Sequence, residues 1–427
     1  MLVLMSKPNH THSGVNAEFA LALTGQSLIK DDVLAGAAPE VQAVAALTRA
    51  ADFSFTGYEG TIAGAHGGWP MKQNFLHVSP PAVLDTLHEM GFNLLSLSNN
   101  HAFDLGPGGI LSTVEEAARR GFAHAGAGAD LTAATRAAVC TRGNASVALV
   151  AMDAGPQGEQ VYATDANQRM AARPGSNRLR VHRTLMVSEA DLARVRDISA
   201  ALGHETSKAA NAKVGYRQTA GEGYAFYDLR FAAGDRCHER LRVDEDDARR
   251  NFASIARARE TADGVIAYVH HHHWNPQWDT TPDWFRTFAH DCVDAGASVV
   301  VSHGVPMLQG IEVYKGAPLF FGLGNFIFHT FQAAKYNDER IWQSVVATCR
   351  FARGRCERIE LTPIVIGGER ALSESDFSSR RAPHIARGEY GARILRRLAD
   401  MSAVFGTRVD VAGDTAHIAI RDIDVTA

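Results

Sequence analysis

Four consecutive histidines, His270 to His273, are the residues of this sequence with the clearest capacity for chemistry. The apolar run 265–269 directly precedes them and is typical of a buried strand. Imidazoles bind transition metals and exchange protons near neutral pH. A polar ring buried without a partner costs roughly 1–3 kcal/mol. A cluster of such rings therefore indicates a functional site at the end of the strand.

Two further apolar runs end in polar residues in the same way. Residues 94–97 lead into Asn100 and His101, and residues 298–301 lead into His303. In α/β proteins, ligands bind at the carboxyl ends of the strands. We therefore expect these polar residues to share one site.

Strand and helix signals alternate along most of the chain and predict an α/β core. Helices are expected over 32–52, 81–90, 110–120, 246–261 and 281–295, and strands over 19–23, 53–55 and 147–152. The polar segment 155–242 breaks this alternation and predicts a large insertion with a helix over 189–202 and a hairpin over 224–231. The expected domains are a core of 1–154 and 243–366, the insertion covering the active site, and a C-terminal accessory segment of 367–427. That last segment is expected to be a surface tail with one helix over 391–403.

Composition narrows the class of protein. The 427 residues are 46% hydrophobic and 21% charged, as in ordinary globular proteins. A net charge of −4 gives no basic surface for nucleic acid, so a small-molecule or peptide-like substrate is expected as the partner. The sequence has no signal-peptide core and no run of about 18 apolar residues, which predicts a cytoplasmic protein without membrane insertion. The five cysteines are scattered along the sequence and are expected to be reduced thiols.

Three sequence blocks resemble one family. Residues 99–109 (NNHAFDLGPGG) closely resemble the NNHxxDxGxxG block of the CapA, or poly-γ-glutamate capsule synthesis, family. Residues 303–328 resemble its glycine-rich block ending in LGNFIF, and residues 51–60 resemble its strand ending in NLEG. The likeness covers 19–330 and implies a metallophosphatase-like four-layer αββα sandwich with a large polar insertion.

The resemblance implies a two-metal centre, from which this sequence departs. Gln26 stands where the family has aspartate, Pro306 where it has histidine, and Gly57 where it has asparagine. Since glutamine is a poor ligand and proline is none, the first metal position is expected to be lost. The second set is retained, so the resemblance implies these metal ligands: Asn100, His270, His303 and Glu59. One divalent transition metal (Mn, Fe or Zn) is the expected cofactor, with a metal-free site as the alternative.

The expected catalytic residues follow from the same blocks. His101 is expected to donate a proton to the leaving group, Asp104 to orient its ring, and Glu59 to act as ligand or base. Residues of one parity share a strand face, so His272 accompanies His270 and is the next candidate. His271 and His273 would then be solvated.

Four residues are candidates for binding the substrate around this site. Arg173 and Arg180 in the insertion could bind a carboxylate or phosphate, or could be solvated. Trp274 could wall a pocket or pack under the insertion. Asn325 matches a family position and could serve the site or its glycine-rich turn.

The leading functional hypothesis is a hydrolase assisted by one metal and acting on an amide, peptide-like or phosphoester bond. A role in poly-γ-glutamate capsule biosynthesis follows from the family resemblance. A metal-independent acid/base enzyme, such as a peptide epimerase, is a third possibility. A non-catalytic binding protein that keeps the fold is the fourth.

Overall fold

The computed structural model describes residues 17–216, 222–369 and 381–420. The chain divides into two compact units, one of Met1–Leu179 with Asp246–Ala427 and the other of Arg180–Glu245. The expected insertion began at residue 155, but residues 155–179 belong to the first unit. That the insertion covers the active site stays a prediction.

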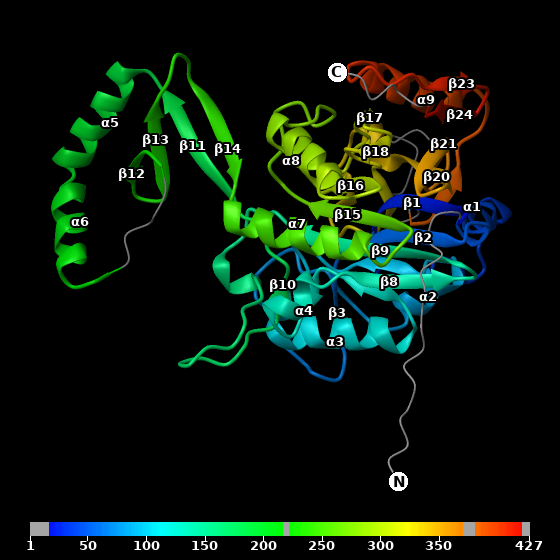
Figure 1. Ribbon diagram of the computed structural model, residues 1–427, viewed down its shortest axis with the longest axis horizontal. Coiled ribbons are helices and arrows are strands. Elements are labelled where there is room, and N and C mark those ends of the chain that lie inside the picture. The colour runs from blue at the N-terminus through cyan, green and yellow to red at the C-terminus, as the bar shows by residue number, and fades with distance from the viewer. Residues whose placement is uncertain (1–16, 217–221, 370–380, 421–427) are drawn as a thin grey trace, which may run out of the picture. The chain divides into compact units, whose positions relative to one another are not determined.

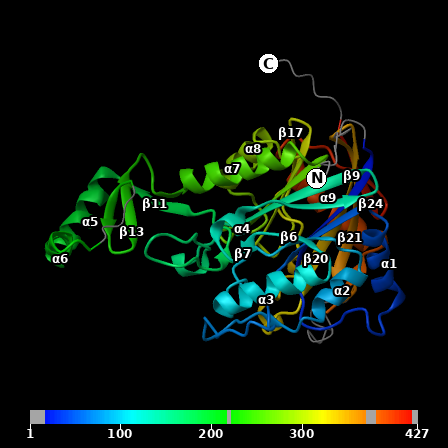
Figure 2. The same cartoon turned by 60° about the horizontal axis from the view of Figure 1, so that its bottom comes forward.

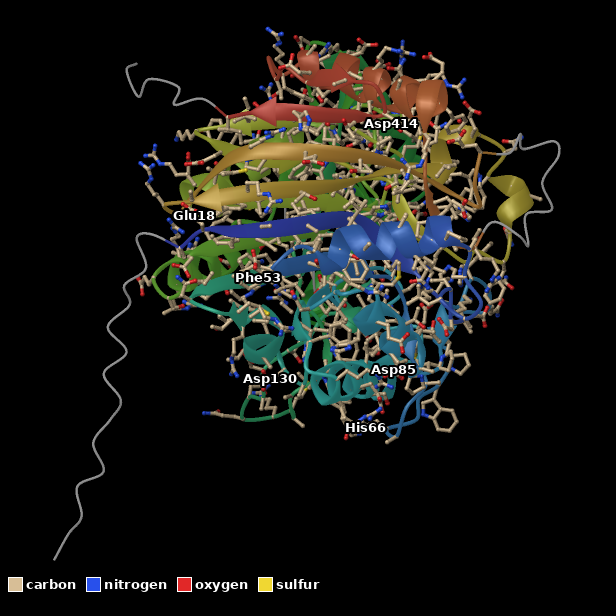
Figure 3. The ribbon with its side chains drawn as sticks, turned by 90° about the vertical axis from the view of Figure 1, so that its right-hand side faces the viewer. Glu18, Phe53, His66, Asp85, Asp130 and Asp414 are labelled. Carbon is tan, nitrogen blue, oxygen red and sulfur yellow. The ribbon has the colours of Figure 1, made fainter. Side chains whose placement is uncertain are left out.

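The larger sheet of the first unit has ten strands (Figure 1). Its main path is β23 (Asp410–Ala412), β24 (Thr415–Ala419), β21 (Arg355–Ile366), β20 (Gln343–Ala352), β1 (Phe19–Leu28), β2 (Phe53–Tyr58), β5 (Leu94–Ser96) and β6 (Ala123–Ala125). In addition, β19 (Asn325–Phe328) pairs with β1, and β22 (Pro383–Ile385) pairs with β21. Strands β1, β2, β5 and β6 run parallel, whereas β20 is antiparallel to β1. Figure 3 views this sheet with β1 between the β2 strand that begins at Phe53 and the strands β20 and β21.

The second sheet of this unit has six strands. They are, in order, β17 (Ile311–Tyr314), β18 (Ala317–Phe320), β16 (Val299–His303), β15 (Gly264–His270), β9 (Ala145–Asp153) and β8 (Ala138–Arg142). The central strands β9, β15, β16 and β18 are parallel, so their carboxyl ends lie at one edge. Short paired strands complete the unit: β3 (Thr61–Ile62), β4 (Val78–Ser79), β7 (Ala127–Gly128) and β10 (Gly175–Ser176).

The two sheets pack face to face through alternate residues of their strands. Leu23 and Phe55 of the ten-stranded sheet belong to the same buried cluster as Leu149 and Ile266 of the six-stranded sheet. The rings of Phe55 and Tyr268 lie 5.3 Å apart between the sheets. Burying such a side chain contributes about 1.5–3 kcal/mol, so this shared core fixes the sheets against each other.

Helices cover the outer faces of both sheets. The helices α1 (Pro39–Arg49), α2 (Val83–Glu89) and α3 (Gly106–Arg119) bury apolar residues in one cluster with the outward side of β2 and β5. Figure 2 shows α2 and α3 along this side. The outward residues Val265 and Val269 of β15 are also fully buried, and α7 (Glu245–Arg259) and α8 (Asp283–Asp294) lie on that side. The resulting helix–sheet–sheet–helix order confirms the predicted four-layer sandwich.

The C-terminal segment differs from the expected surface tail. Its described part contributes β22, β23, β24 and the helix α9 (Gly388–Ala403), and the strands extend the ten-stranded sheet. Leu395, Leu398 and Ile418 are buried in the shared core. The sequence pattern concealed this because the strands are short and separated by polar turns.

The second unit carries a four-stranded sheet in the order β12-β13-β11-β14 and two helices. Its elements are β11 (Val181–Val187), α5 (Glu189–Ala201), α6 (His204–Lys213), β12 (Tyr224–Phe226), β13 (Leu229–Ala233) and β14 (His238–Val243). The expected helix and hairpin are both present. Helix α6 was missed because it buries none of its residues and so has no apolar periodicity.

No helix within the described ranges combines the length and the apolar character needed to cross a bilayer. All five cysteines are free.

One close backbone approach near the site yields a stability test. A Cβ on Gly25 would lie 1.6 Å from the carbonyl oxygen of Gly324, and only a shift of the backbone could relieve this clash. We expect Gly25→Ala to lower the free energy of unfolding by at least about 3 kcal/mol, measured by urea denaturation. Gly143 lies in a turn with nothing within 4 Å of its Cβ position. Gly143→Ala should cost only about 1 kcal/mol for its positive φ, and equal losses would contradict this account.

Candidate active site

Strand ends from both sheets meet at the site. On the six-stranded sheet, Asp153, His270 and His303 lie side by side in register at the carboxyl ends of β9, β15 and β16. On the ten-stranded sheet, Gln26 of β1 pairs with Gly57 of β2. Because the sheets face each other, residues from distant parts of the sequence converge here, as the sequence predicts.

A cluster of Glu59, His270 and His272 forms the centre of the site. One potential ligand atom from each residue lies within 4.8 Å of the others. The Nε2 atom of His270 is 3.2 Å from Nε2 of His272 and 2.9 Å from Oδ1 of Asn100. The predicted shared face of His270 and His272 is therefore confirmed.

The protonation states of this cluster suit a metal ion. Burial lowers the pKa of His272 to about 3, and burial with neighbouring histidines holds the pKa of His270 well below its usual value. Both rings are therefore neutral at pH 7 and keep a lone pair for a ligand bond. Burial, with the charge of Asp104, raises the pKa of Glu59 to about 8, so its carboxyl retains a proton unless a cation replaces it.

The donor atoms also fit a metal by type and spacing. Two nitrogens each about 2.1 Å from a tetrahedral ion would lie about 3.4 Å apart, close to the observed 3.2 Å between the His270 and His272 rings. Two imidazoles, a carboxylate and the amide oxygen of Asn100 match the ligands used by Zn²⁺, Mn²⁺ and Fe²⁺. The site can therefore hold one divalent transition metal.

His101 and Asp104 form a hydrogen-bonded pair beside this cluster. The Nδ1 atom of His101 lies 2.7 Å from Oδ2 of Asp104, and its Nε2 atom lies 3.9 Å from Oε1 of Glu59. Burial lowers the pKa of His101 despite the opposing effect of Asp104. A neutral ring that donates Nδ1–H to the carboxylate presents the lone pair of Nε2 toward the cluster.

Asp104 is held by three groups. Its Oδ2 atom also accepts a hydrogen bond from the backbone N–H of His77, and its Oδ1 atom lies 2.8 Å from the Lys72 ammonium. Burial alone would raise the pKa of Asp104, but its contacts with His101 and Lys72 hold the pKa below its usual value. The carboxylate therefore remains charged and orients His101.

A cavity of about 340 Å³ opens onto these residues. Asn100 and His272 connect its lining to the cluster, while residues 155–158 form another part of its wall. Lys72 is the one lysine, arginine, aspartate or glutamate among the lining residues, and its ammonium also donates to the backbone oxygen of Asn100. The cavity is thus suited to a ligand that is neutral or negatively charged near this ammonium.

His303 lies at the site, but both of its ring nitrogens are engaged. Its Nδ1 atom accepts a hydrogen bond from the Gly304 backbone, and its Nε2 atom donates to the oxygen of Gly324. Its ring centroid is 6.3 Å from that of His270. His272 takes the place in the cluster that the sequence assigned to His303, and the role of His303 as a ligand stays a prediction.

The other two histidines of the run are buried, which corrects the expectation that they are solvated. His271 packs against the rings of Trp284 and Phe285, and His273 lies 3.0 Å by Nε2 from the oxygen of Ala154. The residues that follow β15 fold under a layer of aromatic rings, which strand periodicity alone does not reveal.

Arg173 and Arg180 have contacts within their own segments. The guanidinium of Arg173 donates to the backbone oxygens of Glu159 and Tyr162 and so stabilises the loop that contains these residues. Arg180 belongs to the second unit and donates to Asp244 there. A role for either arginine in binding substrate stays a prediction.

Trp274 lies beside the cluster. Its ring is tilted against that of His272 at a centroid distance of 4.8 Å, and its indole N–H donates to the oxygen of His271. Trp274 therefore fixes the orientation of His272.

Asn325 and Gln26 lie next to each other on β19 and β1, and both are buried. The Asn325 amide donates to the oxygen of Ile341, whereas Oδ1 of Asn325 and Oε1 of Gln26 have no hydrogen-bond partner among the described residues. The Gln26 side chain hydrogen-bonds to Glu59 and so supports the cluster.

The missing side chain at Gly57 has a structural counterpart. A Cβ on Gly57 would lie 2.7 Å from the hydroxyl oxygen of Tyr268. Tyr268 is fully buried between the sheets, and burial followed by the charges of Glu59 and Asp153 raises its pKa well above the usual value. A neutral phenol therefore fills the space beneath Glu59 that a side chain on β2 would otherwise occupy.

Three residues of the site were not predicted from the sequence. Lys72 and His77 lie in a loop without any periodic pattern, so nothing in the sequence placed them beside Asp104. Asp153 ends the apolar strand β9, and the pattern of a polar residue at a strand end could have identified it. Its carboxylate accepts hydrogen bonds from Gly155 N–H and from the Gln157 side chain.

A four-layer sandwich with a histidine, carboxylate and asparagine cluster at its strand ends defines a metallophosphatase-like protein. Residues 20–330 match the model of the family described as bacterial capsule synthesis protein PGA_cap. The chain belongs to this family, which confirms the resemblance seen in the sequence.

Relatives cover different shares of the chain. An uncharacterised protein of Sinorhizobium fredii is 28% identical over 450 residues, spanning 94% of this chain and 93% of the relative. The PGA biosynthesis protein CapA of Bacillus subtilis is 34% identical over 113 residues, which are 26% of this chain and 27% of that protein. A probable polyglutamine synthesis accessory protein of Mycobacterium tuberculosis is 26% identical over 294 residues, covering 68% of this chain and 59% of that protein.

Asp153 yields a pH-dependent stability test. Burial, opposed by its two hydrogen bonds, raises the pKa of Asp153 to about 7. The folded protein therefore binds an extra proton between about pH 4 and 7, and its stability falls as the pH rises through this window. We expect Asp153→Asn to gain on the order of a few kcal/mol relative to wild type between pH 4 and pH 8.

The measurement is urea unfolding of both proteins at each pH. Comparing the change with pH cancels any constant cost of placing an amide beside the two donors. Unfolding free energies of wild type and Asp153→Asn that stay parallel from pH 4 to pH 8 would show that this carboxyl is not destabilised by burial.

Proposed function

We propose that this protein catalyses amide-bond cleavage or transfer on an anionic glutamate polymer of the poly-γ-glutamate type, assisted by one divalent metal. The observation that carries this proposal is that a candidate metal-binding cluster and a hydrogen-bonded histidine–aspartate pair meet at one cavity. The Glu59, His270 and His272 cluster lies beside the His101–Asp104 pair, and both adjoin the Lys72 ammonium.

Glu59, His270 and His272 would hold the metal, with Asn100 as a further oxygen ligand. A bound divalent cation supplies Lewis acidity, which polarises a carbonyl group and lowers the pKa of water. The neutral imidazoles and the carboxyl with a raised pKa are prepared to accept a cation in exchange for one proton.

His101 would move the proton. In hydrolysis, water adds to the carbonyl carbon of the amide, the C–N bond breaks, and the water proton must reach the leaving nitrogen. The Nε2 atom of His101 accepts that proton and delivers it, while Asp104 holds the ring and stabilises its positive charge. The sequence predicted only the second half of this role, donation to the leaving group.

Lys72 would select the substrate. An ammonium held by Asn100 and Asp104 faces a cavity whose lining carries no aspartate or glutamate, so it favours a carboxylate near the reacting amide. A phosphoester is less well matched by one ammonium than by the guanidinium clamps typical of phosphoryl transfer. The relatives named for PGA biosynthesis and polyglutamine synthesis support the same substrate class.

A metal-free acid/base reaction is the second candidate. It is favoured by the pKa of Glu59, about 8, which lets this carboxyl donate a proton 3.9 Å from the His101 ring. Removal of a proton next to a carbonyl by one group and its return by the other would need no metal.

Metal analysis of protein purified without a histidine tag tests the main proposal. We expect about one equivalent of Mn, Fe or Zn in the wild type and at least a ten-fold loss in His272→Ala, because a ligand is removed. His303→Ala is the matched control and should keep its metal, since both ring nitrogens of His303 bond to the backbone. If the metal is lost only in His303→Ala, the result would instead support the ligand set predicted from the sequence.

Activity on short γ-linked glutamate oligomers is the second measurement, with phosphodiesters as the competing substrates. We expect His101→Gln to lower kcat by about 10²- to 10⁴-fold while its metal content stays unchanged. Full activity after complete metal removal would favour the acid/base reaction. The absence of turnover on every substrate by the metal-loaded wild type would instead indicate a binding protein.

A further inference from the structure

A second cavity, of about 460 Å³, lies away from the candidate active site and shares no lining residue with the first cavity. It is formed by the short helix α4 (Leu131–Thr135), the start of β8 and one face of α7 (Figure 1). All of the lining residues belong to the first unit.

Its lining is rich in positive charge. Arg136, Arg250 and Arg257 line it, and Asp165 is the one carboxylate among the lining residues. Asp165 already accepts a hydrogen bond from the backbone of Thr132. Three arginines therefore line one cavity together with a single carboxylate, and this excess of positive charge favours an anion there.

Two of these arginines have no ion-pair or side-chain hydrogen-bond partner among the described residues. Arg136 follows α4, and Arg257 lies two turns after Arg250 on α7, so both can turn toward the cavity. Guanidinium groups present planar pairs of N–H donors that match carboxylate and phosphate oxygens. These two side chains are free to bind such a group.

Arg250 provides a fixed donor. Its guanidinium shares the carboxylate of Asp247 with Arg178, so one carboxylate serves two positive charges. The contacts with Asp247 and with the backbone oxygen of Arg178 hold this positive charge in place at the cavity wall, where it attracts an anion.

We propose that this arginine cavity is a binding site for a polyvalent oxyanion, bound through carboxylate or phosphate groups by Arg136, Arg250 and Arg257. The site is independent of the catalytic cluster and does not rest on the proposed reaction. Its ligand is either free phosphate or the carboxylates of an acidic polymer, since both offer the same planar pairs of oxygen acceptors.

Titration calorimetry at low salt, with inorganic phosphate and with a γ-linked glutamate oligomer as separate probes, tests this site. We expect the double variant Arg136→Gln/Arg257→Gln to bind the preferred probe at least about ten-fold more weakly, because two charged contacts are lost. Tighter binding of phosphate or of the oligomer by the wild type identifies the source of the oxyanion. Arg249→Gln is the matched control: Arg249 lies on the same helix, pairs with Asp246 and does not line the cavity.

A second measurement uses the wild type alone. Either probe that binds should protect Arg136 and Arg257 from modification by an arginine-directed dicarbonyl reagent, whereas Arg249 should react at an unchanged rate. Binding that is equally strong in the double variant, or the failure of both probes to bind the wild type, would overturn the proposal.

Discussion

The site depends on the packing of two strands that belong to different sheets. Phe55 and Gly57 lie on one face of β2 and Glu59 directly follows this strand, while Tyr268 and His270 project toward them from β15. The ring contact between Phe55 and Tyr268 fixes the distance and register of this pair of strands. The position of Glu59 relative to His270 is a direct consequence, so the shared core and the site are built by the same interdigitation.

Burial then sets the chemistry of these side chains. Low solvent access favours neutral imidazoles in His270 and His272 and a protonated carboxyl in Glu59. Asp104 remains ionised because His101 and Lys72 compensate its charge. The candidate metal ligands therefore lie next to an Asp104 carboxylate that already has partners in His101 and Lys72, and these contacts orient the His101 ring.

The sequence predicted the sandwich, and it predicted that most residues of the candidate site lie close together, because both depend on local patterns. Apolar runs that end in Asn100, His270 and His303 located the strand ends, and side-chain parity placed His272 with His270. The choice between His303 and His272 in the cluster was not accessible, because it depends on backbone groups of Gly304 and Gly324 that engage the His303 ring. Lys72 was missed for a related reason, since only tertiary contacts bring its loop to Asp104.

The filled space at Gly57 limits which substitutions the chain can accept at this position. A residue with any side chain at this position would meet the phenol of Tyr268, and a smaller residue in place of Tyr268 would leave a void below Glu59. Each single change is penalised, whereas both together preserve the packing. The two positions are therefore coupled, and a side chain can enter β2 at residue 57 without loss of stability only when Tyr268 is replaced at the same time.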